Sequence, residues 1–145
     1  MSAENTLQRL RQFLLLVVAA IFIGTIFELI LLGHTEESQQ WIPFIASFLG
    51  LVMIGWVWKS ATENSLKTLR WIMLGICLVS LLGMYFHFSG NFFFALEINP
   101  SMTWTEAIWP AMTGSYPFLA PGILFLAGIL GIAATYRHPE LLGQD

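Results

Sequence analysis

The sequence predicts an all-α integral membrane protein, a four-transmembrane-helix bundle with both termini in the cytoplasm. Three observations lead to this prediction: a composition that is 57% hydrophobic and 10% charged, four long apolar segments, and basic residues confined to one side of those segments. Soluble domains carry about 25% charged residues, so a chain this apolar needs lipid as its main solvent. The whole chain, residues 1–145, is expected to form a single membrane domain.

The first apolar segment, residues 13–33, contains one charged residue, Glu28. A helix rises ~1.5 Å per residue, so about 20 residues cross the hydrocarbon core. A secretory signal peptide is the competing interpretation. It is rejected because the apolar run is longer than the usual 7–15 residues and no small-residue cleavage site follows. Gly33 is a suitable stop for the helix.

The other three predicted spans are residues 41–58, 71–88 and 118–136. A polar connector, residues 59–70, is expected between the second and third spans. The fourth span is entered through Pro117 and Pro121. Within it, Ala127 and Gly131 form a pair of small residues four apart, which predicts a close approach to a neighbouring helix.

Basic residues give the orientation of the chain. With four spans, all six fall on one side of the membrane: Arg9, Arg11, Lys59, Lys67, Arg70 and Arg137. The loops on the other side, residues 34–40 and 89–117, contain none. The positive-inside rule therefore places both termini in the cytoplasm. The expected location is a bacterial inner (cytoplasmic) membrane, with the opposite loops in the periplasm.

The second outer loop, residues 89–117, is expected to carry a short interfacial helix. Gly90-Asn91 indicates a turn after the third span. Thr103 and Glu106 have the spacing of a capping box, which predicts a helix over residues 103–112. Two roles stay open for this loop: a lid or docking surface, or a simple structural return of the chain to the membrane.

Ionisable residues gather at the outer ends of the first and third spans. A charged residue inside a spanning helix is costly, so Glu28 is a candidate functional residue. The alternative is a protonated carboxyl group that bonds to Ser47 or Tyr85 on a neighbouring helix. His34 and His87 lie at the outer ends of the first and third spans, and in a compact bundle these ends can be close together.

Histidine together with carboxylate is a common ligand set for transition metals. The predicted site for copper, zinc or iron consists of four residues: Glu28, His34, His87 and Glu97. No local spacing resembles a dedicated metal motif, and the chain has a single cysteine. A histidine among aromatic residues also permits axial ligation of a haem or a chlorin. Each histidine can equally be an ordinary interfacial or loop residue.

Composition excludes some function classes and leaves three. The net charge of −3 and the scarcity of Lys and Arg exclude a nucleic-acid partner. The leading hypothesis is a small accessory subunit of a larger membrane assembly, with a membrane-protein partner and an outer-face Glu/His pocket. The alternative is a stand-alone metal- or haem-binding membrane protein that uses Glu28, His34 and His87. A membrane enzyme acting on lipid or quinone head groups at the outer interface ranks last.

Overall fold

A computed structural model describes residues 3–143 and is all-helical, with no strand in that range. Three helices are long and apolar enough to span a membrane. These are α1 (Ala3–Leu31), α2 (Ile42–Lys59, preceded by the short 3-10 helix η1, Ser38–Trp41) and α3 (Glu63–Ile98). The shorter helices are α4 (Trp104–Thr113), α5 (Gly122–Ala133) and α6 (Pro139–Leu142). The all-α prediction is thus confirmed, with three long apolar helices rather than four.

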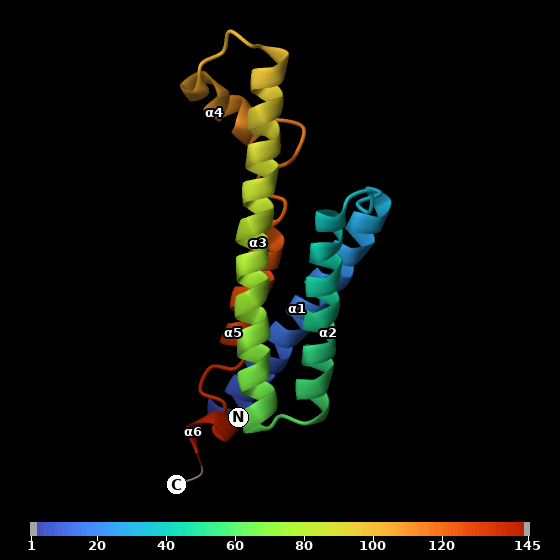
Figure 1. The fold of residues 1–145 in the computed structure, drawn as a ribbon. Coiled ribbons are helices and arrows are strands. Elements are labelled where there is room, and N and C mark those ends of the chain that lie inside the picture. Colours follow the sequence, from blue (N-terminus) through green and yellow to red (C-terminus); the bar gives the residue numbers. More distant parts are fainter. Residues whose placement is uncertain (1–2, 144–145) are drawn as a thin grey trace.

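Four helices close into a bundle in which each contacts two neighbours. α1 packs against α2 and α5, and α3 packs against the same two helices. Figure 1 shows α1 and α2 as a hairpin beside α3. The start of α1 and the short helix α6 lie at one end of this bundle, together with the link between α2 and α3. We call this the basal end.

The first helix is longer than the predicted span. α1 begins at Ala3 because the polar residues before the apolar run are also helical. It ends at Leu31, and Gly33 follows with a positive φ of 62°. Only glycine adopts this left-handed conformation without a steric cost. The predicted helix stop at Gly33 is therefore confirmed.

The predicted polar connector over residues 59–70 is wrong. The link is only three residues long, and α3 begins at Glu63. The reason is a capping box at the start of α3. The Ser65 N–H donates to the Thr62 hydroxyl oxygen at 3.2 Å, and the Ser65 hydroxyl oxygen accepts a hydrogen bond from the Thr62 N–H at 2.9 Å. These bonds satisfy backbone groups that would otherwise lack partners at the start of a helix.

The predicted turn at Gly90-Asn91 is also wrong, because α3 continues to Ile98. Asparagine favours turns, since its side chain competes with backbone hydrogen bonds. Here the Asn91 side chain is buried and instead bonds to the segment that follows α4. Tertiary hydrogen bonds therefore outweigh the local turn preference at this position.

A short helix is found where the sequence predicts one, as α4 over Trp104–Thr113. Its capping box forms as expected, with the Thr103 N–H donating to the Glu106 carboxylate at 2.8 Å. Ala107 and Ala111 are fully buried against α3. α4 and the end of α3 project beyond the α1–α2 hairpin in Figure 1. We call residues 89–98 of α3 and residues 99–116 together the arm.

The fourth predicted span contains a helix of only 12 residues, α5, flanked by turns at residues 118–121 and 134–137. The predicted close approach is present. The Cβ that an alanine would add at Gly128 lies 2.7 Å from the Met73 carbonyl oxygen, and one at Gly131 lies 2.6 Å from the Met73 Sδ. α5 therefore lies directly against the backbone of α3.

Candidate functional site

His87 is fixed in orientation by a backbone carbonyl. Its Nδ1 donates to the Pro117 carbonyl oxygen at 2.8 Å, because a carbonyl can only accept. The ring also lies 6.1 Å from the ring of Tyr116, between centroids. With the proton on Nδ1, the Nε2 atom of the neutral ring carries a free lone pair.

His34 lies in the turn after α1 and is partly buried. Burial lowers the pKa of His34, and an electrostatic effect from His87, which acts when the His87 ring is protonated, lowers it further. An electrostatic effect of this kind acts over several ångströms and does not require contact. The two histidines, one just after α1 and the other within α3, are therefore near enough to influence each other's charge.

This pairing predicts a pH dependence. A histidine with a lowered folded-state pKa binds fewer protons folded than unfolded, so stability is lost as the pH falls below about 6.5 toward the folded pKa. We expect NMR titration of the purified protein to give a His34 pKa below the ordinary value, and His87→Gln to raise it. His138→Gln, at the basal end, is the matched control and should leave it unchanged. An unchanged His34 pKa in His87→Gln would contradict the pairing.

The two carboxylates of the predicted metal site lie apart from this pair. Glu28 is on an exposed face of α1, and Glu97 is exposed near the end of α3. Glu97 is ten residues beyond His87, which is about 15 Å along a helix. Within residues 3–143, no group of three or more His, Cys, Asp or Glu side chains is placed to hold a metal ion. The four predicted residues are thus not gathered into one group in the described part of the chain.

The alternative role predicted for Glu28, a hydrogen bond to a neighbouring helix, is not formed to Ser47. The Ser47 hydroxyl is completely buried and has no hydrogen-bond partner in the described part of the chain. Tyr85, the other suggested partner, is exposed. Glu28 is instead exposed on α1.

A second cluster at the basal end was not predicted from the sequence. Arg11 is only 7% exposed, and its Nε donates to the Tyr136 carbonyl oxygen at 3.1 Å while its Nη2 donates to that of Arg137. Arg70 approaches the same segment from α3 and donates to the hydroxyl and the carbonyl oxygen of Thr135, at 2.6 and 3.2 Å. Cations at this position also complement the negative end of the α5 dipole.

One sequence signal could have revealed Arg11. It lies four residues before Leu15 and seven before Val18, and all three are buried on one face of α1. A basic residue in register with the apolar face of a helix is expected to point inward. The signal was missed because nearly every residue of the first apolar segment, residues 13–33, is apolar, so no apolar face of the helix can be distinguished in the sequence.

The arm is the third candidate. Asn91 holds it together: Nδ2 donates to the carbonyl oxygens of Ala111 and Tyr116 at 3.1 and 2.7 Å, and Oδ1 accepts from the Tyr116 N–H at 3.0 Å. Large apolar side chains nevertheless remain exposed on its surface: Phe93, Phe94, Ile98, Trp104, Ile108, Trp109, Met112 and Tyr116. On a soluble domain an apolar surface of this extent marks an interaction site, and in a membrane protein it contacts lipid or another protein.

Comparisons with protein-family models, with curated proteins and with solved structures found no match to this chain.

Proposed function

We propose that this chain is a small integral membrane accessory subunit of a larger membrane assembly, and that the arm is the surface on which its partner docks. The single observation that carries the proposal is the set of exposed aromatic side chains on the arm. Trp104 and Trp109 are 76% and 71% exposed. Tryptophan is the residue most enriched at the energetic centres of protein–protein interfaces.

The proposed placement in the membrane follows from charge and length. All six basic residues belong to the basal end, which the positive-inside rule assigns to the cytoplasm of a bacterial inner membrane. α5 and its flanking turns, residues 118–137, would complete the fourth crossing. At ~1.5 Å per residue, the 36 residues of α3 measure about 54 Å, whereas the hydrocarbon core is about 30 Å thick. The arm then reaches into or beyond the outer interface.

Charge indicates the kind of partner. Residues 71–136 contain no lysine or arginine, and the charged residues of the arm are both acidic, Glu97 and Glu106. Hydrogen bonds from Thr103 lower the pKa of Glu106, so this carboxylate is ionised at neutral pH. Complementary charges at the rim of an interface guide association. The expected partner is a membrane protein with an apolar outer surface edged by basic side chains.

Mild detergent extraction from the native membrane tests this proposal. The wild-type chain should migrate in native gels as part of a complex much larger than its own 16.3 kDa. The double variant Trp104→Ala/Trp109→Ala should be released from it, since truncating a central tryptophan costs about 2 kcal/mol or more. Trp71→Ala is the matched control, because this tryptophan is 72% exposed outside the arm. A wild-type chain that runs alone would refute the proposal.

A second candidate function is transition-metal binding between His34 and His87. It is favoured by the bond from His87 Nδ1 to Pro117, because a metal-binding histidine nearly always donates its other ring N–H to an oxygen of this kind. Elemental analysis of protein purified without chelators or an affinity tag tests it. Stoichiometric copper, zinc or iron that disappears in His87→Gln would support it, and metal that persists in that variant, or its absence from wild type, would refute it.

A further inference from the structure

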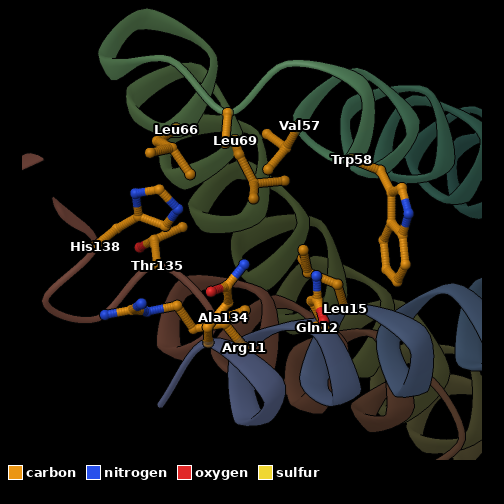
Figure 2. A pocket seen from close by; sticks show the side chains of 12 residues that line it. Arg11, Gln12, Leu15, Val57, Trp58, Leu66, Leu69, Ala134, Thr135 and His138 are labelled. Atoms are coloured by element: carbon orange, nitrogen blue, oxygen red, sulfur yellow. The ribbon is translucent and has the colours of Figure 1, made fainter. Parts of the chain in front are cut away.

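A cavity opens at the basal end, where four parts of the chain meet. It has a volume of about 210 Å³ and lies between the start of α1, the end of α2, the start of α3 and the segment after α5. In Figure 2, Val57, Leu66 and Leu69 line one side, and Arg11 and Gln12 approach from the opposite side. Trp58 and His138 lie at opposite ends of the cavity. The cavity is thus enclosed by residues that are far apart in the sequence.

The two sides of this cavity differ in chemistry. The apolar side comes from the bundle core: Leu66 and Leu69 are 1% and 0% exposed, and Leu15 continues the same surface. The polar side comes from Gln8, Arg11, Gln12, Thr135 and His138. A ligand that fits both sides has a polar head beside an apolar body.

The charge of the polar side is positive. The hydrogen bonds of Arg11 go to backbone carbonyls, which orient the guanidinium group without neutralising it. Glu4 is the acidic residue that acts on Arg11, and Glu140 is the one that acts on His138. Burial and then the charge of Arg11 lower the pKa of His138, against a smaller opposite effect of Glu140. The positive charge of Arg11 therefore acts on His138, a second residue that lines the cavity.

We propose that this cavity binds the phosphate-bearing headgroup of an anionic lipid, with the guanidinium group of Arg11 facing the phosphate and the apolar side receiving the first carbons beyond it. Basic pockets between spanning helices on the cytoplasmic side are suited to such headgroups. Arginine matches the geometry of phosphate oxygens. The volume accommodates a headgroup and its glycerol, while the acyl chains remain in the bilayer.

Native mass spectrometry of delipidated protein tests the proposal by titration with phosphatidylglycerol and phosphatidylcholine. We expect phosphatidylglycerol to bind at least about fivefold more tightly than phosphatidylcholine, because one favourable charge contact near the surface contributes a difference of this size. Inorganic phosphate, added alone, distinguishes the lipid from the free anion and should bind much more weakly. Equal binding of the two lipids, or phosphate binding as tight as that of phosphatidylglycerol, would overturn the proposal.

Two variants with matched controls locate the site. Arg11→Gln should remove the preference for phosphatidylglycerol, whereas Lys59→Gln removes the same charge at the same end, outside the cavity, and should retain it. Because Arg11 also binds the end of α5, Gln12→Glu serves as a second variant: Gln12 is exposed, and the added negative charge should repel the phosphate. Its control is Asn64→Asp, which adds the same charge at an exposed position outside the cavity. Equal losses in variant and control would show general surface attraction and refute the site.

Discussion

Asn91→Ala is expected to release α4 from α3. The substitution removes three hydrogen bonds and leaves the Ala111 carbonyl and both backbone groups of Tyr116 without their partner. A buried polar group left unpaired costs about 1–3 kcal/mol, so we expect a local loss of about 3 kcal/mol or more. α4 contacts no other helix extensively, and it has few alternative contacts to hold it in place.

Hydrogen exchange of the α4 amides measures this release. A loss of about 3 kcal/mol corresponds to roughly a hundredfold faster exchange, while the amides of α1 and α2 should keep their rates. Asn64→Ala is the matched control, since it alters an exposed asparagine in the first turn of the same helix. If α4 exchanged at the same rate in Asn91→Ala and Asn64→Ala, Asn91 would not be what holds the arm together.

Gly128→Ala is expected to separate α5 from α3. The new Cβ would lie 2.7 Å from the Met73 carbonyl oxygen and closer still to the Cys77 Sγ, and a backbone atom cannot move aside cheaply. Overpacking of this kind costs about 1–3 kcal/mol. Gly131→Ala should cost less, because its new Cβ meets the flexible side chain of Met73.

The single cysteine supplies the measurement for this prediction. Cys77 is buried at the contact between α3 and α5, so a thiol-reactive dye labels it only when the two helices part. Labelling during a thermal ramp should occur at a lower temperature in Gly128→Ala than in wild type. Gly75→Ala is the control, because nothing lies within 4 Å of its added Cβ. Equal labelling temperatures in the two variants would argue against the tight contact.

Local signals in the sequence located much of this fold. The long apolar runs, the capping box of Thr103 and the stop at Gly33 each correspond to a feature of the structure. These signals act within one or two helical turns, so no tertiary information is needed to interpret them. The C-terminal end of α3 was harder to predict from the sequence. Gly90-Asn91 has the local chemistry of a turn, but it is kept helical by hydrogen bonds to residues 20–25 positions away.

The candidate sites also divide into features that the sequence indicates and features that only tertiary packing decides. Topology suggested that His34 and His87 could approach each other, and the electrostatic effect of His87 on His34 agrees with that expectation without showing a contact. The basal cavity could not be predicted in the same way. Arg11 and Arg137 are 126 residues apart, and in a uniformly apolar helix the inward face is decided only by packing. The same basic residues that indicate orientation in the sequence therefore have a second role that only the fold reveals.

Site-specific photo-cross-linking in the native membrane tests whether the arm is a docking surface for another membrane protein. A photoreactive amino acid at Trp109, on the arm, should yield one discrete adduct with a different membrane protein. The same probe at Trp71, outside the arm, should not yield that adduct. The Trp109 adduct should disappear when Trp104→Ala is added. Cross-links to lipid alone from position 109, or identical adducts from both positions, would contradict the assignment of the arm as a docking surface.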